Sequence, residues 1–329
     1  MRYSFIIPVY NRPEEVDELL NSLTRQTNKN FEVLIVEDGS SVPCKEVVDN
    51  YADRLDICYY FKSNSGPGQT RNYGAERGHG EYLIILDSDC ILPEGYLAAV
   101  ESELQRQKAD AFGGPDRAHD SFTNIQKAIN YAMTSFFTTG GIRGGKKKMD
   151  KFYPRSFNMG VRAEVYKALG GFSKMRFGEE SVLCSRIGEG GYACRLFPEA
   201  WVWHKRRTDL KKFFKQVHNS GIARINLYKK YPESLKVVHL LPALFTIGIV
   251  FLLLCSLVCS WSLSLLLLFA LIICVDSTLR NKSFKIGLLS ILASFIQLIG
   301  YGTGFLRAWW KRCVLGKNEF AAFEKNFYK

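Results

Sequence analysis

The sequence predicts an α/β fold in which a mostly parallel, three-layer sheet is followed by hydrophobic helices. Three observations support this prediction. Short apolar segments alternate with helical patterns over the first hundred residues, acidic residues follow several of these segments, and a long apolar run begins near residue 237. Strands that alternate with helices favour a parallel sheet with right-handed crossovers. The chain has 329 residues, enough for one large domain or two small ones.

The predicted strands are short apolar runs of the kind that is buried in a parallel sheet. They cover Tyr3–Val9, Phe31–Val36, Leu55–Phe61 and Tyr82–Leu86. Helical patterns follow Pro13 and Pro93 and cover Cys44–Arg54 and Thr70–Arg77. In the first helix, apolar residues recur at helical spacing and are expected to pack on the sheet. After residues 111–114 the pattern becomes irregular, and the Gly- and Lys-rich segment 140–148 is expected to be a mobile basic loop.

Two stretches in the last third of the chain are apolar enough for a membrane, residues 237–275 and 286–306. One span needs about 20 apolar residues, so the first stretch is long enough for two helices joined near Trp261. We predict hydrophobic helices at about 239–258, 262–276 and 286–306. A soluble protein with long buried helices is the alternative, but a soluble core rarely hides so long an uncharged run. The predicted domains are a globular part over 1–230, a membrane region over 231–310 and a basic tail over 311–329.

The orientation follows from the positions of Lys and Arg, which favour the cytoplasmic side. Basic residues precede the first predicted span and also lie between the second and third spans. We therefore expect a multi-pass protein of the cytoplasmic (inner) membrane, with its globular part in the cytoplasm. A third full span would place the basic tail outside, so residues 286–306 either break this rule or lie partly in the interface. The basic stretch Lys211–Lys230 is interpreted as an interfacial helix.

The formal net charge of +12 fits a basic surface beside anionic lipid. Nucleic-acid binding would also explain it, but the chain has no recognisable motif for reading nucleic acid. The nine cysteines contain no Cys-x-x-Cys pair, so neither a disulfide framework nor a zinc site is expected. The first apolar stretch, Phe5–Val9, is too short for a secretory signal.

The segment Asp87-Ser88-Asp89 follows the last of the four predicted strands. Ligands of open α/β sheets bind outside the carboxyl ends of the strands, where these two carboxylates are expected. Mg²⁺ prefers oxygen ligands and usually combines one or two carboxylates with phosphate oxygens of the substrate. The pair therefore suits a divalent cation (Mg²⁺ or Mn²⁺) that bridges a diphosphate. Capping of the following helix is an equally ordinary role for aspartates in this position.

Two further motifs have chemistry that suits a nucleotide. Glu37 and Asp38 end the second strand, where an acid can accept hydrogen bonds from a base or a ribose, although the same residues also mark an ordinary turn. Gly66–Asn72 opens a helix with two glycines and Arg71. Backbone amides at a helix start and an arginine fork can contact a diphosphate. This segment is not a Walker loop, because it lacks the Gly-Lys-Ser/Thr ending.

The order of these motifs resembles that of the family 2 glycosyltransferases of the GT-A fold. The resemblance depends on Ile6-Ile7-Pro8-Val9-Tyr10-Asn11, Val36-Glu37-Asp38-Gly39-Ser40, Gly66–Asn72 and Leu86-Asp87-Ser88-Asp89, and it covers about residues 3–225. It implies a GT-A domain over 1–230, a nucleotide-diphosphate-sugar donor and a divalent metal. The nucleotide-sugar site that it implies consists of Pro8, Tyr10, Asn11, Glu37, Asp38, Arg71 and Asp87. It also implies that Asp87 and Asp89 hold the metal, Asp89 more directly, and that His204 completes the metal or diphosphate site.

The segment Phe177-Gly178-Glu179-Glu180 is similar to the family's Gly-Glu-Asp motif, which assigns the role of catalytic base to Glu180. Two features depart from the family pattern, because Glu replaces the usual Asp and Val182 replaces a second acid. A glutamate can still act as the base if it reaches the acceptor hydroxyl. Alternatively, Glu179 and Glu180 only favour a helix N-terminus through the helix dipole.

The resemblance implies an inverting transferase that moves a sugar from the donor to a hydroxyl group of a glycan acceptor. Because the predicted helices place the domain at a membrane, we expect a lipid-linked acceptor and a role in the assembly of a cell-surface polysaccharide. A soluble acceptor is the alternative, in which case the helices are only an anchor. A non-catalytic membrane scaffold built on a glycosyltransferase-like domain is the competing class of function, and Val182 is its best support.

Overall fold

The computed structural model describes residues 2–117, 122–140, 154–174, 178–205 and 209–320. Their contacts divide the chain into two compact units, one formed by the described parts of residues 1–117 and 151–204 and one by those of 118–150 and 205–324. This division groups the described parts of residues 118–150 and 205–230 with the hydrophobic helices. The domain boundary expected at residue 230 stays a prediction.

The first unit contains a seven-stranded sheet in the order β3-β2-β1-β4-β8-β6-β9. The strands are β1 (Tyr3–Val9), β2 (Phe31–Asp38), β3 (Ile57–Lys62), β4 (Tyr82–Leu86), β6 (Ala111–Gly113), β8 (Asn158–Arg162) and β9 (Cys194–Leu196). The first four are parallel, whereas β8 runs antiparallel to both β4 and β6. This mostly parallel sheet confirms the predicted fold class. β1 and β4 have the predicted bounds, and β2 continues to Asp38.

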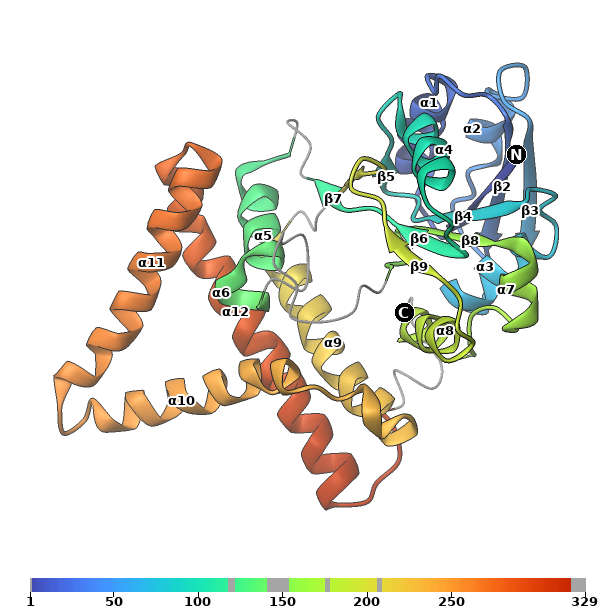
Figure 1. Cartoon of the computed structure of the whole chain (residues 1–329). Helices are drawn as coiled ribbons and strands as arrows, with labels where there is room; N and C mark the ends of the chain where they lie inside the picture. Colours follow the sequence, from blue (N-terminus) through green and yellow to red (C-terminus); the bar gives the residue numbers. More distant parts are fainter. Residues whose placement is uncertain (1, 118–121, 141–153, 175–177, 206–208, 321–329) are drawn as a thin grey trace. The chain divides into compact units, whose positions relative to one another are not determined.

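Helices cover both faces of this sheet (Figure 1). They are α1 (Pro13–Thr24), α2 (Lys45–Asp49), α3 (Pro67–Ala75), α4 (Tyr96–Arg106), α7 (Ala163–Ala168) and α8 (Glu179–Glu189). Phe5 and Ile7 of β1 lie in the core cluster shared with α1, α2 and α4, while Ile6 lies in the cluster shared with α7 and α8. Successive side chains of a strand point to opposite faces, so one apolar strand contributes to both cores.

A second, three-stranded sheet brings distant residues to the end of β4. It consists of β5 (Cys90–Ile91), β10 (Val202–His204) and β7 (Asp116–Arg117), in the order β5-β10-β7. In the antiparallel pair of β5 and β10, His204 lies opposite Cys90. This pairing places His204 beside the segment Asp87-Ser88-Asp89, from which it is more than a hundred residues distant in the sequence.

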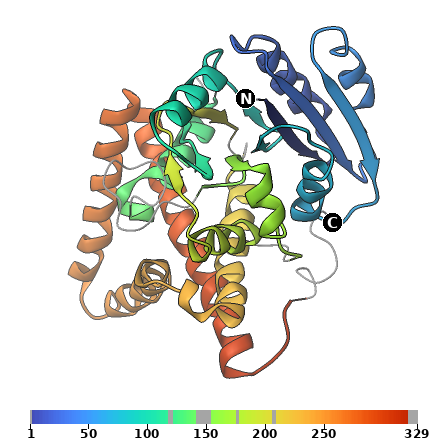
Figure 2. The same cartoon turned by 45° about the vertical axis from the view of Figure 1, so that its right-hand side comes forward.

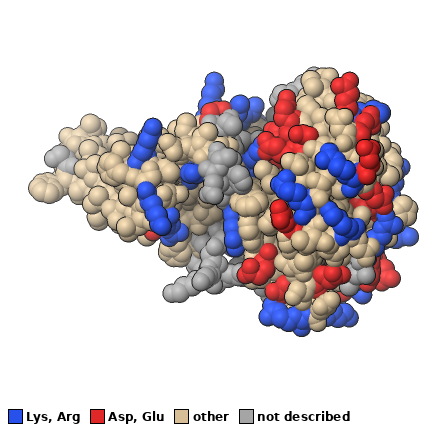
Figure 3. All heavy atoms as spheres, turned by 90° about the horizontal axis from the view of Figure 1, so that it is seen from above, with Lys and Arg blue, Asp and Glu red and all other residues tan. Residues whose placement is uncertain are grey.

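The second unit is helical. It contains α5 (Asn124–Thr134), α6 (Phe136–Thr139), α9 (Leu210–Lys230), α10 (Leu241–Cys255), α11 (Ser264–Asn281) and α12 (Phe284–Trp309), with short turns η1 (Pro232–Ser234), η2 (Val237–His239), η3 (Ser260–Leu263) and η4 (Trp310–Val314). Two helical segments, Trp261–Asn281 and Phe284–Val314, are long and apolar enough to cross a membrane, and α10 is a shorter apolar helix. On the face seen in Figure 3, the part formed by α10 and α11 shows mainly uncharged residues. These features weakly support association with a membrane.

Helix α5 corrects the expectation of irregular structure after residue 114. Its N-terminus has a capping box, in which Thr123 accepts a hydrogen bond from the Gln126 amide and the Gln126 side chain accepts one from the Thr123 amide. Its apolar residues Ala128, Ile129, Ala132 and Met133 lie in a core cluster with residues of α9 and α12. The Tyr131 hydroxyl donates a 2.7 Å hydrogen bond to Asp276 of α11. The predicted basic loop 140–148 lies outside the described residues from position 141 onward.

Helix α9 packs along α12 (Figure 2), so much of its apolar face contacts protein. Glycines allow this close approach. A Cβ atom on Gly304 would lie 2.0 Å from the carbonyl oxygen of His218, and one on Gly221 would lie 2.2 Å from that of Tyr301. Small residues at such positions are typical of helices that pack together in membranes.

Candidate active site

The parallel strands β1, β2 and β4 all end at the same edge of the sheet. Asp38 ends β2, and Asp87 directly follows β4. The chain after β1 contains Tyr10 and Asn11. This edge is where ligands of open α/β sheets bind. The structure therefore brings the motifs at the ends of these three strands to one side of the first unit.

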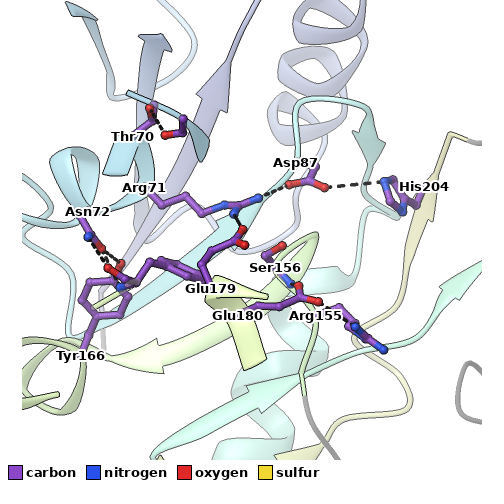
Figure 4. Close-up of polar contacts among 12 residues, drawn as sticks. Thr70, Arg71, Asn72, Asp87, Arg155, Ser156, Tyr166, Glu179, Glu180 and His204 are labelled. Atoms are coloured by element: carbon purple, nitrogen blue, oxygen red, sulfur yellow. Dashed lines mark hydrogen bonds and ion pairs between the residues drawn. The ribbon is translucent and has the colours of Figure 1, made fainter. Parts of the chain in front are cut away.

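Arg71 connects the end of β4 with the start of α8 (Figure 4). Its Nη2 donates a 2.8 Å hydrogen bond to Asp87 Oδ1, and its Nη1 donates a 3.0 Å bond to Glu179 Oε1. The Arg71 side chain is 5% exposed, and its guanidinium lies 5.2 Å from the ring centre of Phe172. The two Nη groups thus bind carboxylates of the protein, so Arg71 orients Asp87 and Glu179.

Asp89 lies between the side chains of His204 and Arg12. His204 Nε2 is 3.1 Å from Asp89 Oδ1 and 3.9 Å from Asp87 Oδ2. Arg12 Nη1 donates a 3.1 Å hydrogen bond to Asp89 Oδ2. The His204 ring stacks on Phe157 with 4.7 Å between ring centres, which fixes the orientation of the imidazole.

The residues at this position fit a divalent cation. One ligand atom from each of Asp89, Cys90 and His204 lies within 4.8 Å of the others. The Cys90 thiol is a poor ligand here, because burial raises its pKa well above the ordinary value and its Sγ contacts the Phe157 carbonyl. Carboxylate oxygens remain, which suit Mg²⁺ or Mn²⁺, together with the imidazole nitrogen of His204 beside them. The buried His204 Nδ1 has no hydrogen-bond partner among the described residues, so this imidazole nitrogen can still bind a ligand.

Glu37 and Asp38 are both buried and are bound by the protein itself. Glu37 accepts hydrogen bonds from the Ser40 hydroxyl, the Cys44 amide at 2.9 Å and the Tyr59 hydroxyl at 3.3 Å. These contacts hold the turn after β2, and the nucleotide contact assigned to Glu37 remains a prediction.

Asp38 has a related structural role at the start of α3. Its carboxylate accepts hydrogen bonds from the Ser65 amide at 2.8 Å and the Gly66 amide at 2.9 Å, and it pairs with Lys62 Nζ at 2.6 Å. Gly66 has a φ of +88°, a conformation that glycine adopts without strain. Asp38 therefore fixes the loop from which the helix carrying Arg71 begins.

The residues after β1 are more accessible to a ligand. Pro8 and Tyr10 are half-buried, and Asn11 is exposed. Asn11 has a φ of +53°, and its side-chain oxygen accepts a 2.9 Å hydrogen bond from the Val42 amide. Its own amide donates a 2.8 Å hydrogen bond to the Ser40 hydroxyl. Asn11 thus ties the loop after β1 to the loop after β2, and the nucleotide contacts assigned to these residues remain predictions.

The neighbouring residues Glu179 and Glu180 bind different arginines. Glu180 Oε1 accepts a 2.7 Å hydrogen bond from Arg155 Nη1, and Oε2 accepts a 3.0 Å bond from the Ser156 amide. Gly178, with a φ of +78°, precedes both at the start of α8. Consecutive helical residues point about 100° apart, so the two carboxylates have separate partners.

Their electrostatic environments also differ. Burial raises the pKa of Glu179 to about 7 despite the opposing effect of Arg71. The pKa of Glu180 is lowered to about 2, because Arg155 and the Ser156 amide stabilise its charged form more than burial destabilises it. In this conformation Glu180 is therefore a fully charged but weakly basic carboxylate.

Sequence reasoning missed Arg12, Arg155 and the contact between Glu179 and Arg71. Arg155 is 25 positions from Glu180, and Arg12 is 77 positions from Asp89, distances at which no local spacing rule applies. One signal in the sequence is the pair Glu179-Glu180 at a helix start. Two consecutive helical residues point in different directions, so each buried carboxylate needs a basic partner of its own. Val182, the residue that stands in place of the family's second acid, is buried in the core and 2% exposed.

Comparisons with known proteins agree with this arrangement. The family model described as Glycosyl transferase family 2 matches residues 4–170. An uncharacterized glycosyltransferase of Rickettsia felis is 33% identical over 137 residues, covering 42% of this chain and 22% of that protein. Glycosyltransferase AglE of Haloferax volcanii is 26% identical over 250 residues, covering 64% of this chain and 77% of AglE. The chain thus spans about a fifth of the length of the Rickettsia felis relative.

Among solved structures, the mannosyltransferase PcManGT of Pyrobaculum calidifontis, determined in complex with GDP-Man and Mn²⁺, has a similar fold. The TM-score is 0.62 at 18% sequence identity, with 90% of this chain and 87% of that chain covered. This likeness supports the GT-A-like fold. Because the family model matches just over half of the chain and includes the motifs at the ends of β1, β2 and β4, the chain belongs to glycosyl transferase family 2.

Proposed function

We propose that this protein is an inverting glycosyltransferase that moves a sugar from a nucleotide-diphosphate-sugar donor to a hydroxyl group of a glycan acceptor. The main support is the cluster in which Arg71 joins Asp87 to Glu179, beside Asp89, His204 and Glu180. Family membership supports the class of reaction, and the Pyrobaculum calidifontis structure contains a donor of the proposed type.

The acidic residues at the end of β4 are proposed to bind the diphosphate end of the donor through a cation. Mg²⁺ or Mn²⁺ held by Asp87, Asp89 and His204 would neutralise charge on the departing diphosphate. Arg71 holds the Asp87 carboxylate in a defined orientation, since their contact is short and largely buried. Arg12 is bound to Asp89 in this structure, and its movement would release an oxygen ligand.

Glu180 is proposed to be the catalytic base. As the acceptor oxygen attacks the anomeric carbon, the carboxylate takes the hydroxyl proton, and the bond between this carbon and the diphosphate oxygen breaks. The electron pair of that bond leaves with the nucleoside diphosphate. Attack from the opposite face in a single displacement inverts the configuration of the sugar. The Ser156 amide orients the carboxylate through its hydrogen bond to Oε2.

A lipid-linked acceptor is proposed from the apolar helices of the second unit. Apolar side chains on α10 and α11 are highly exposed, including Leu254 at 60%, Leu267 at 70% and Leu271 at 59%. Large contiguous apolar surfaces of this kind suit a bilayer rather than water. A transferase on the inner membrane could meet a lipid-linked glycan by diffusion in two dimensions, as expected for assembly of a cell-surface polysaccharide.

The test is an assay of the purified full chain with a set of nucleotide sugars, in the presence of Mn²⁺ or Mg²⁺. Release of nucleoside diphosphate and transfer to lipid-linked and water-soluble acceptors are measured separately. We expect transfer from at least one donor, with faster transfer to the lipid-linked acceptor. If no donor binds or is consumed, the non-catalytic scaffold replaces this proposal. Equal rates with both acceptors would contradict only the lipid-linked part.

A further inference from the structure

Glu180 is held by two neighbouring residues, Arg155 and Ser156, in the segment before β8. Arg155 and Ser156, which bind its two oxygens, belong to a tight turn in which the Asn158 amide donates a 2.9 Å hydrogen bond to the Arg155 carbonyl. Asn158 is fully buried, and its side chain binds the Tyr96 hydroxyl at 2.6 Å and the Ala200 carbonyl at 2.8 Å. The positions of the arginine and the amide are therefore set by the core of the first unit.

The two contacts differ in how easily they can be broken. The Ser156 amide is part of the backbone, so its hydrogen bond holds the carboxylate in place. The Arg155 side chain is 32% exposed and has several rotatable bonds, so its guanidinium can move into solvent while Glu180 stays where it is. Figure 4 shows that Glu179 and Arg71 form a separate pair, joined by their own hydrogen bond.

The contact with Arg155 has a chemical consequence. A carboxylate that forms a short ion pair with arginine is stabilised in its charged form and is a weaker base. Proton transfer is most effective when the base has a pKa near the working pH, so Glu180 in this state activates a hydroxyl or a water poorly. Other charged or titratable groups that act on this pair of residues are Arg71, Glu179, Cys184 and Asp116.

We propose that Arg155 is a positioning residue that keeps Glu180 in a weakly basic resting state and thereby suppresses hydrolysis of the donor until an acceptor is bound. This inference rests on the proposed function of Glu180. In the suppressed reaction, water attacks the anomeric carbon, and Glu180 takes a proton from the water. The bond to the diphosphate oxygen breaks with its electron pair on the leaving group, so the products are free sugar and nucleoside diphosphate.

The test compares Arg155→Gln with the wild-type full chain. Donor hydrolysis is measured without acceptor, and transfer is measured with acceptor, using the donor that the wild type accepts. We expect Arg155→Gln to hydrolyse the donor about tenfold faster or more, because Glu180 becomes more basic. Arg155→Lys keeps the charge and is expected to restore low hydrolysis at least in part. The double variant Arg155→Gln/Glu180→Gln should hydrolyse no faster than Glu180→Gln.

Arg162→Gln is the matched control. Arg162 is 31% exposed, has a 2.9 Å ion pair with Asp110, and lies at the opposite end of β8 from Asn158. Its loss should leave hydrolysis unchanged. Binding of nucleoside diphosphate with Mn²⁺ shows whether each variant is folded, and Arg155→Ala, which also removes the charge, provides the test if Arg155→Gln does not fold.

The outcomes separate the two proposals. Wild-type transfer together with unchanged hydrolysis in Arg155→Gln, or in Arg155→Ala where that variant replaces it, overturns this inference and leaves the proposed function standing. Raised hydrolysis that persists in the double variant also overturns it, because the water is then activated without Glu180. Absence of both donor hydrolysis and transfer in the wild type overturns the proposed function and this inference together.

Discussion

Arg71 and Glu179 are 108 positions apart in the sequence, yet their side chains form a 3.0 Å hydrogen bond in the interior of the first unit. Through its other Nη group, Arg71 also binds Asp87. One guanidinium therefore links the acidic segment after β4 with the helix that begins with Glu179 and Glu180. A single buried cation thereby joins the proposed metal site to Glu179, the residue that precedes the proposed base in the sequence.

Replacement of Arg71 tests this link. Arg71→Met would leave the buried Glu179 without its partner, and breaking one side of a buried ion pair typically costs about 3 to 5 kcal/mol. We expect a loss of this size in the free energy of unfolding, measured by chemical denaturation in detergent. Arg106→Gln removes an ion pair with Glu103 in which the arginine is 68% exposed, and it should change stability by about 1 kcal/mol or less. A similar effect of both variants would contradict the proposed link.

Removal of the proposed metal ligand tests the role of the segment after β4. Asp89→Ala should abolish the Mn²⁺-dependent part of nucleotide-sugar binding, since it removes the carboxylate nearest to His204. Calorimetric titration of the donor with Mn²⁺ and with a chelator measures this directly. Asp53→Ala, at an exposed position on the surface, is the control. Donor binding that is equally strong with and without chelator in the wild type would count against a metal.

Substitution of the proposed base should separate chemistry from binding. Glu180→Gln keeps the size of the side chain but cannot accept the acceptor proton, and we expect kcat to fall by about 10² to 10⁴. Donor affinity, measured by titration, should change little. The exposed Glu164→Gln on α7 should retain wild-type activity. Near-normal turnover of Glu180→Gln would refute the assignment.

The raised pKa of Glu179 predicts how stability depends on pH. Burial raises this pKa from 4.5 to about 7 in the folded protein. A carboxyl group with a higher pKa in the folded state contributes stability that is present below the unfolded value and is lost as the pH rises through the folded value. Relative to Glu179→Gln, the wild type should therefore lose stability between about pH 5 and pH 8. A difference in melting temperature that is independent of pH would contradict this.

Native cysteines can test the predicted orientation in the membrane. Cys259 lies exposed between α10 and α11, and Cys58 is exposed on β3 of the first unit. A membrane-impermeant maleimide added to intact spheroplasts should label Cys259, whereas Cys58 should react only after lysis. Cys259→Ser and Cys58→Ser identify each signal. Labelling of Cys58 in intact spheroplasts would contradict the cytoplasmic placement of the first unit.

The strands and the acidic motifs could be predicted because their signals are local. β1 and β4 are uninterrupted apolar runs, and Asp87 follows directly where the last run ends. The capping box of α5, formed by Thr123 and Gln126, is also a local signal, although the irregular pattern of the surrounding residues does not indicate a helix. Each of these features is defined by residues that are close together in the sequence.

The contacts of the site could not be predicted, because they depend on the tertiary fold. Nothing near Glu180 in the sequence indicates Arg155 as its partner. Likewise, nothing near Glu37 indicates that the Cys44 amide and the Tyr59 hydroxyl donate hydrogen bonds to its carboxylate. Such pairs form only when the crossovers and the antiparallel strand β8 bring separate segments together.

The hydrogen bond between Tyr131 and Asp276 has a practical consequence for protein production. Helix α5 belongs to a long insertion between β7 and β8, and it packs with α9 and α12. A shortened protein ending at residue 230 would retain α5 and α9 but lose α12, so Ala128, Phe213 and Val217 would be exposed to water. We expect such a truncation to aggregate during expression, even though it includes every residue of the sheet.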